Sequence, residues 1–241
     1  MASLDGSGKW RGLFIAALIY LGWLGHLIFW LSAELDRSLL PWIAPALLVQ
    51  TWLYVGLFIT AHDAMHGAVV PGREGLNRRV GQAAVFSYAL FSFKKLLQRH
   101  GLHHSFPASE KDPDFHDGVH TGPLRWYLHF MLHYLTIPQL VGMALLFNLL
   151  QHGAGVPLAN LLLFWVAPAL LSTFQLFYFG TYLPHRRPQE GYDNMHRALS
   201  SDYPVWLSLL TCFHFGYHLE HHVQPTVPWW RLPRIHLPGE R

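Results

Sequence analysis

Three short clusters of histidine are the residues of this sequence best suited to chemistry. His62 and His66 form an HxxxH pattern, and HxxHH patterns begin at His100 and at His218. Neutral imidazole is a common ligand of iron, zinc and copper. Because residues three and four apart share one face of a helix, each cluster is expected to aim its nitrogens at one point. The clusters predict a metal centre with the ligands His62, His66, His100, His103, His104, His218, His221 and His222.

The number of these histidines indicates two metal ions. A zinc ion usually takes four ligands, and the clusters supply eight imidazoles, enough for two metals that each keep room for a substrate. Iron is favoured because two redox-active metals can activate dioxygen, although imidazole binds zinc as well and zinc stays an alternative. His185, at the end of a long apolar run, is the candidate for a ninth ligand.

A few other side chains are candidates for orienting the ligands through the ring nitrogen that does not bind the metal. Asp63 and Glu220 lie inside clusters, and Asp114 lies with Asp112 in the segment after the second cluster. Such carboxylates can accept a hydrogen bond from the second nitrogen of a ligating imidazole and fix its tautomer; solvated charge or helix capping is the alternative. His214 lies one helical turn before the third cluster on the same stripe, which favours a supporting role over direct ligation.

The elements that must hold these residues are predicted to be membrane helices. The chain has 241 residues, of which 51% are hydrophobic and only 13% charged, against about a quarter in soluble domains. A membrane-spanning helix needs about 20 apolar residues. The long uncharged runs predict an all-α integral membrane protein, one domain over residues 1–241, with four transmembrane helices at about 12–31, 39–61, 126–150 and 157–183. The single cysteine, Cys212, excludes an internal disulfide and a cysteine-based metal site.

The basic residues predict the orientation of these spans. Residues 1–11, 62–125 and 184–241 contain 16 of the 17 Lys and Arg residues. The positive-inside rule then places both termini and all three histidine clusters in the cytoplasm, as a di-metal cap on the four helices. An amphipathic stretch at 80–98 is expected to lie in the membrane interface. The net charge of +3 indicates contact with lipid head groups, and no basic stripe indicates binding to nucleic acid.

Five segments carry a resemblance to a known family. They are HDAMHG at 62–67, RHGLHH at 99–104, KDPDFH at 111–116, FGTYLPHR at 179–186 and FHFGYHLEHH at 213–222. The histidine clusters resemble the histidine boxes of the membrane fatty acid desaturase and hydroxylase superfamily. With the KDPDFH and FGTYLPHR segments the chain is most similar to the bacterial β-carotene 4-ketolases of that superfamily, over roughly residues 13–230.

The resemblance implies a di-iron oxygenase with two Fe²⁺ ions and dioxygen as co-substrate. It would convert the C4 methylene of carotenoid β-ionone rings to a ketone by successive hydroxylations, from β-carotene through echinenone to canthaxanthin. The carotenoid would come from the bilayer, and the electrons from a separate donor such as ferredoxin. The resemblance places the protein in the bacterial inner membrane, with the eight cluster histidines and His185 as iron ligands.

Two other functions remain open from the sequence. A fatty-acyl desaturase or hydroxylase would share the histidine boxes, and a metal transporter would share the ligands but hold them near the middle of the membrane. If a carotenoid ring is the substrate, the aromatic residues before the boxes either pack around it or belong to the core. These are Phe91, Phe93, Phe213 and Tyr217.

Overall fold

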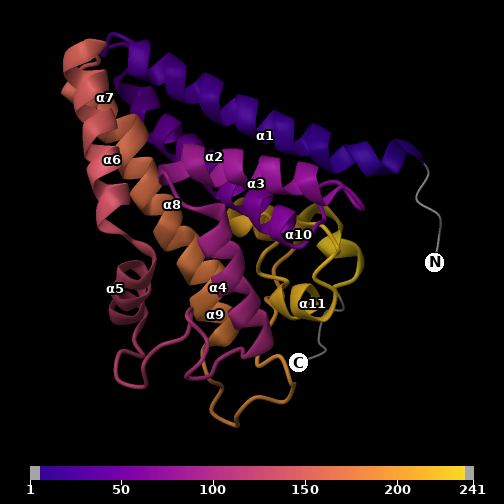
Figure 1. Ribbon diagram of the computed structural model, residues 1–241. Coiled ribbons are helices and arrows are strands. Elements are labelled where there is room, and N and C mark those ends of the chain that lie inside the picture. The colour runs from indigo at the N-terminus through magenta and orange to yellow at the C-terminus, as the bar shows by residue number, and fades with distance from the viewer. Residues whose placement is uncertain (1–5, 237–241) are drawn as a thin grey trace.

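The computed structural model describes residues 6–236, and these are arranged in helices (Figure 1). The predicted all-α class is confirmed for the described part of the chain, where the only β-pairing is an isolated bridge between Ser200 and Tyr217. Residues 1–5 and 237–241, which were predicted to be cytoplasmic, lie outside the described residues. The first helices are α1 (Gly6–Ser32), α2 (Leu40–Met65), α3 (Glu74–Ala89) and α4 (Phe93–Ser105).

The second half of the chain contains shorter helices and several π-helical segments. They are α5 (Pro123–Tyr134), α6 (Ile137–Asn148), α7 (Leu158–Leu161), α8 (Ala167–Phe177), α9 (Leu183–His185), α10 (Val205–Cys212) and α11 (His218–Val223). π-helical turns extend α6 at Leu149–Gly153 and join α7, α8 and α9 at Leu162–Val166 and Tyr178–Tyr182. The segment from α7 to α9 is therefore one long helix.

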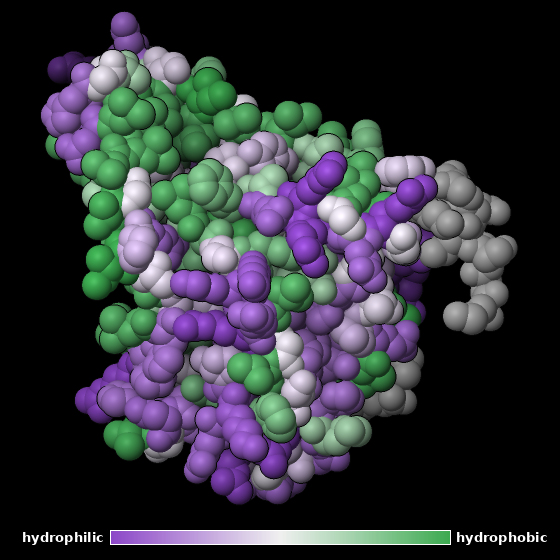
Figure 2. Space-filling model, viewed as in Figure 1, coloured by the Kyte–Doolittle hydropathy of each residue, from purple (hydrophilic) through white to green (hydrophobic). Residues whose placement is uncertain are grey.

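Within residues 6–236, three helices are long and apolar enough to cross a membrane. They are Trp10–Ser32, Leu40–Met65 and Leu158–His185, and the first, second and fourth predicted spans lie on them. Their surfaces carry large exposed apolar side chains, as at Phe14 and Leu48. Figure 2 shows these apolar surfaces gathered over α1 and the α6–α8 end of the molecule, whereas the end with α11 and the loops is mostly hydrophilic. The division is that of a membrane protein with one polar cap.

The predicted third span at 126–150 is broken in the structure. Helices α5 and α6 meet at an angle of 89° across Leu135 and Thr136, which have extended backbone. Pro138 explains the break, because it has no N–H to donate to the carbonyl of Tyr134 and its ring would clash with that carbonyl. The structure thus has three candidate spans, or four if the bent pair counts as one.

The predicted amphipathic stretch at 80–98 is also two helices. Helix α3 ends at Leu90, whose φ of 57° is left-handed, and Ser92 caps the start of α4 by accepting a hydrogen bond from the amide of Lys95. The turn lets α4 leave α3 and run toward the polar end of the molecule (Figure 1). It carries the second histidine cluster to the end of α2, where the first cluster lies.

The third cluster is positioned by a short helix after a strained turn. Phe213 and His214 both have left-handed backbone, with φ of 49° and 62°. They end α10 and separate it from α11, so His214 does not lie on the helical stripe of the third cluster as the spacing predicted. Phe213 is buried against Trp52 of α2, with ring centroids 4.3 Å apart. This contact anchors the turn and fixes the direction of α11.

Candidate metal centre

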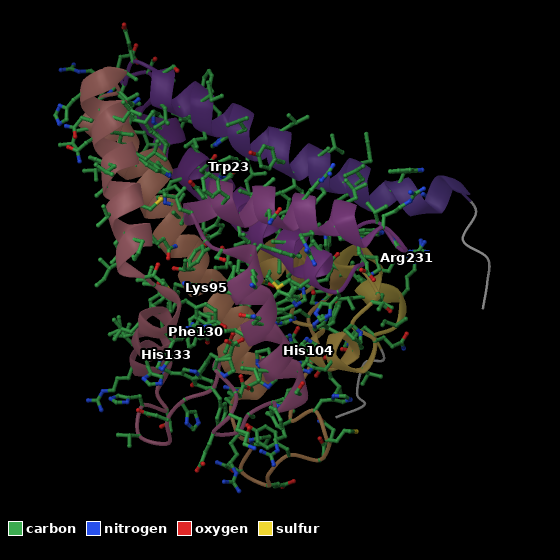
Figure 3. The ribbon with its side chains drawn as sticks, in the orientation of Figure 1. Trp23, Lys95, His104, Phe130, His133 and Arg231 are labelled. Atoms are coloured by element: carbon green, nitrogen blue, oxygen red, sulfur yellow. The ribbon has the colours of Figure 1, made fainter. Side chains whose placement is uncertain are left out.

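Four separate elements bring the predicted ligands together at the polar end of the molecule. The first cluster lies at the end of α2, the second on α4 and the third on α11, while His185 ends the long helix formed by α7 to α9. Figure 3 shows many side-chain nitrogens gathered between α4 and α11, beside His104. All nine predicted histidines lie in two groups whose ligand atoms are each within 4.8 Å of one another.

The first group contains five histidines from three elements. His66 and His100 face each other with 2.7 Å between their Nε2 atoms, and the Nε2 atoms of His104 and His221 are 3.1 Å apart. His62 lies among them, and both its ring nitrogens are buried without a hydrogen-bond partner in the described residues. We call this set the five-histidine group: His62, His66, His100, His104 and His221.

The second group contains four fully buried histidines. The Nε2 atom of His222 lies 3.2 Å from that of His103 and 3.1 Å from that of His218, and the Nε2 atoms of His218 and His185 are 2.9 Å apart. The Nδ1 atom of His185 contacts the carbonyl of Arg197 at 2.9 Å. A carbonyl only accepts, so this Nδ1 carries the proton and the Nε2 lone pair points into the group. These residues are called the four-histidine group.

The geometry of both groups fits metal ions. Two nitrogens that are each about 2.1 Å from one metal, at roughly 90° to each other, are about 3.0 Å apart, and the observed Nε2 separations run from 2.7 to 3.2 Å. The alternative, hydrogen bonding between imidazoles, leaves both buried ring nitrogens of His62 unpaired within residues 6–236. Unpaired buried polar atoms are costly, and a metal ion would satisfy one of these two nitrogens.

Burial keeps most of these imidazoles neutral. Burial first, and then the neighbouring histidines, lower the pKa of His66 to about 4 and that of His104 to about 2. The same two causes lower the pKa values of His100, His218 and His221 well below the ordinary value of a histidine. Neutral imidazole keeps the lone pair that a metal needs. The electrostatics therefore suit ligation.

His103 is different because a carboxylate lies directly behind it. Burial lowers its pKa, but the hydrogen bond and charge of Asp112 outweigh this and raise the pKa overall. Both carboxylate oxygens of Asp112 lie 3.0 Å from Nδ1 of His103. Asp112 also accepts hydrogen bonds from the amides of Ala108 and Asp114, which hold it in place. A carboxylate on the second nitrogen is the arrangement that orients metal-binding histidines.

Asp114 makes no hydrogen bond to a histidine of the two groups, although its predicted role requires one. Its carboxylate oxygen is 3.8 Å from Nδ1 of His103, too far for a hydrogen bond, and it accepts a hydrogen bond from the hydroxyl of Tyr134. Burial first, opposed by the charge of His103, raises its pKa to about 6. Asp112, and not Asp114, contacts the ring of His103. The DPD motif marks both aspartates, but only the loop geometry shows which one reaches the imidazole.

The other three positioning candidates lie near the histidines without a hydrogen bond to their ring nitrogens. Asp63 accepts the amide of Trp229 at 3.1 Å, while His62 Nδ1 is 3.9 Å away. Glu220 accepts hydrogen bonds from Ser200 and from Nδ1 of His236. His214 is outside both groups. Asp63 and Glu220 thus hold neighbouring parts of the chain and do not bind the rings of the nine histidines.

An apolar cavity, here named the inner cavity, reaches both groups. It is bordered by His62 and His100 of the five-histidine group and by His103 and His218 of the four-histidine group. Its walls include Phe58, Phe91, Phe130, Phe177 and Phe215. Of the four aromatics predicted to contact a ring or fill the core, Phe91 lines this cavity, while Phe93, Phe213 and Tyr217 are buried in the core.

A second cavity, the outer cavity, continues from the inner one along α6 and α8. Tyr88, Phe91, Met131 and Thr173 line both cavities. The outer walls include Leu140, Met143 and Phe147 of α6 and Ala169 and Leu170 of α8. Leu140 and Leu170 are more than half exposed, so this cavity borders the apolar surface of the molecule. The two cavities together lead from that surface to the histidines.

Helical membrane proteins with two histidine groups at one polar end form a recognisable class, the histidine-box membrane proteins. The fatty acid desaturase family model matches residues 37–155 and 135–240. A β-carotene ketolase of Paracoccus sp. strain PC1 is 44% identical over 236 residues, 95% of this chain and 93% of the relative. This chain therefore belongs to the fatty acid desaturase family and, within it, groups with the β-carotene ketolases, which confirms the resemblance predicted from the histidine boxes.

Algal relatives share a similar level of identity. A β-carotene ketolase of Haematococcus lacustris is 40% identical over 241 residues, covering 94% of this chain and 75% of the relative. A protein of Chlamydomonas reinhardtii named zeaxanthin 4-ketolase is 39% identical over 233 residues, 93% of this chain and 50% of the relative. The likeness thus extends over almost the whole chain.

Proposed function

We propose that this chain is a membrane ketolase that oxidises the C4 methylene of carotenoid β-ionone rings to a ketone. The family makes it an oxidoreductase of the oxygenase kind, and relatives named β-carotene ketolases cover nearly its full length. The observation that carries the proposal is the pair of connected apolar cavities that ends at the histidine groups. Their predominantly apolar lining suits a hydrophobic substrate that enters from the lipid.

The proposed course of the reaction is two hydroxylations at the same carbon. Each one takes up O₂, two electrons and two protons, and forms one hydroxyl group and one water. The resulting gem-diol loses water to give the ketone. β-Carotene would thus become echinenone when one ring is oxidised and canthaxanthin when both are.

We further propose two iron ions as the cofactor, one held by each histidine group. Redox-active iron would supply the activation of O₂ when bound. The nine histidines would hold the ions, and Asp112 would orient His103. The phenylalanines of the inner cavity would position the ring and exclude water, because they surround the histidines with apolar surface. Water exclusion protects such reactions from side products.

The electron donor is proposed to be a separate acidic protein such as ferredoxin. Three members of the five-histidine group are only half-buried, whereas the four-histidine group is fully buried. Electrons from a donor at the protein surface therefore have a shorter path to the five-histidine group. In the loops that follow α4 and α9, Lys111 lies over the ring of Phe106 and Arg197 donates to the carbonyl of Ala108. These cations favour a negatively charged partner.

The proposed location is the bacterial inner membrane with the histidines on the cytoplasmic side. The support is the positive charge of the polar end together with the positive-inside rule. Arg37 is the one basic residue in the predicted loop at the other end. Cytoplasmic histidines would also face the compartment in which soluble electron carriers are found.

Expression in a bacterium that makes β-carotene tests the proposal directly. Pigment analysis is expected to show echinenone and canthaxanthin, and cells with the His103→Ala variant are expected to keep β-carotene only. Unchanged pigments together with altered fatty acids would instead favour the acyl desaturase alternative.

Supplied 4-hydroxy-carotenoid should also become the ketone, because one hydroxyl changes affinity for an apolar pocket by roughly 100-fold or less. An inert 4-hydroxy compound would refute the two-hydroxylation course.

A further inference from the structure

A third set of metal-ligating side chains lies outside the two histidine groups. Asp117 and His120 belong to the loop before α5, and His129 lies on α5 itself. Each offers one ligand atom, and the three atoms all lie within 4.8 Å of one another. No step proposed above uses any of them. Asp117 and His129 line one surface hollow together with His133, which Figure 3 labels.

The geometry directs all three side chains at one point. Nδ1 of His120 lies 2.6 Å from Oδ2 of Asp117, and Nδ1 of His129 lies 4.0 Å from the same oxygen. The two imidazole rings are nearly parallel, with an interplanar angle of 14° and centroids 5.9 Å apart. The other oxygen of Asp117 accepts the amides of Val119 and His120 at 3.0 and 2.8 Å. The carboxylate is therefore held with Oδ2 toward both rings.

The chemistry of these donors selects a class of metal. Asp117 offers a carboxylate oxygen, and His120 and His129 each offer an imidazole nitrogen. Two imidazole nitrogens and one carboxylate oxygen suit divalent transition metals such as Zn²⁺, whereas Ca²⁺ and Mg²⁺ prefer oxygen ligands throughout. The side chains are 34% exposed at Asp117, 45% at His120 and 27% at His129, so an ion can reach them from water.

A surface hollow provides room for completing the coordination. Asp117 and His129 line it together with His133 and His116. The ring of His133 is 4.3 Å from that of His129, measured between centroids, and water has access as well. The same hollow is bordered by Asp112, the carboxylate that holds His103.

We propose that Asp117, His120 and His129 bind one divalent transition-metal ion of the Zn²⁺ type. The ion ties the loop at 117–120 to α5. It thereby restrains the segment that begins at Asp112 and supplies the carboxylate behind His103. The site is structural and is separate from the ketolase proposal, since none of its ligands belongs to either histidine group.

Zinc binding by the intact, detergent-solubilised protein tests the proposal. The protein is dialysed against Zn²⁺ alone, and the metal bound per chain is counted for the unaltered protein and for His129→Ala, His120→Ala and Asp117→Asn. Each variant is expected to bind one Zn²⁺ fewer. His152→Ala, which removes an exposed histidine elsewhere, is the matched control and should bind as much as the unaltered protein. Zinc held by the histidine boxes cancels in the comparison because every variant keeps those boxes.

His120→Ala guards against misfolding as an explanation, because its side chain is the most exposed of the three. It should insert in the membrane with the helix content of the unaltered protein while losing the extra ion. Equal zinc binding by His120→Ala, Asp117→Asn and the unaltered protein would overturn the proposal. So would an equal loss in His152→Ala, since the ion would then be bound non-specifically.

Discussion

At the scale of single residues, His103 has surroundings that no other histidine of the two groups has. Its Nδ1 contacts the carboxylate of Asp112, which is buried and fixed by two backbone amides. His185 has a neutral carbonyl in the corresponding place. A carboxylate donates more electron density through the ring than a carbonyl does. How strongly His103 binds a metal ion should therefore depend on Asp112.

Replacing Asp112 with alanine is therefore expected to weaken metal binding without removing a ligand. Loss of such a partner typically costs 10- to 100-fold in metal affinity or activity. Metal content after dialysis and the rate of ketone formation would measure the effect. Glu110→Ala is the control, because Glu110 is an exposed carboxylate of the same loop. Equal metal retention by Asp112→Ala and Glu110→Ala would show that Asp112 has no such role.

Removal of a histidine from either group should have a larger effect. His221→Ala, in the five-histidine group, and His103→Ala, in the four-histidine group, are each expected to abolish ketone formation. The protein should still insert in the membrane, since the backbone hydrogen bonds of the spans are satisfied within each helix. Pigment analysis and membrane fractionation measure the two results. A variant with most of its activity would exclude that histidine as a ligand.

Sequence patterns predicted the clustered histidines more accurately than they predicted the neighbouring residues that orient them. The spacing of the three clusters predicted eight of them, and the end of an apolar run marked His185 as the ninth. The structure gathers the same nine into two groups; their role as ligands stays a prediction. Asp112 could not be separated from Asp114, because both follow α4 in one irregular loop. The error at His214 has a different cause. A helical stripe assumes an unbroken helix, and left-handed backbone at 213–214 breaks it.

At the scale of elements, the bend between α5 and α6 opens the path to the histidines. Leu135 at the bend and Met143 on α6 line the outer cavity, and Met131 on α5 lines both cavities. If the third span were straight, α5 and α6 would share one axis, and the angle between them that accommodates the outer cavity would be absent. Hydropathy could not reveal the bend, because the two sides of Pro138 together are apolar enough to count as one span. A hydropathy profile reports the composition of a segment and not the direction of its helix axis.

Enlarging Met131 should close the connection between the cavities. Met131→Trp is expected to lower ketone formation at least about tenfold, because overpacking a filled passage blocks it or forces its walls apart. The metal content should not change. Leu132→Trp is the matched control, since this neighbouring side chain is 76% exposed. Similar activity in the two variants would show that the substrate does not pass Met131.

At the scale of the whole molecule, the proposed metal ions would cross-link distant parts of the chain. The five-histidine group joins α2, α4 and α11, and the four-histidine group joins α4, α9 and α11. The spans pack through large buried residues such as Tyr54 and Trp165. The polar cap has long loops and short helices, so it depends more strongly on the metals.

Chelation should consequently loosen the cap and leave the spans intact. A bound metal stabilises a fold by about 2.7 kcal/mol when its free concentration is 100 times Kd. We expect the metal-free protein to be cleaved faster by protease in the loop between α9 and α10, while its helix content by circular dichroism stays nearly constant. The holoprotein at equal concentration is the control. Identical cleavage of both forms would show that the cap does not need metal.

The connected cavities also bear on how a two-ended substrate is processed. Under the proposed function, a carotenoid with one ring beside the histidines would have its polyene in the outer cavity and its other ring toward the lipid. The far ring could then react only after the molecule had left, turned round and entered again. We therefore expect oxidation to be distributive, with the monoketone returning to the bilayer between turnovers, where it competes with fresh substrate. The ratio of monoketone to diketone in the membrane is then set by enzyme abundance and residence time.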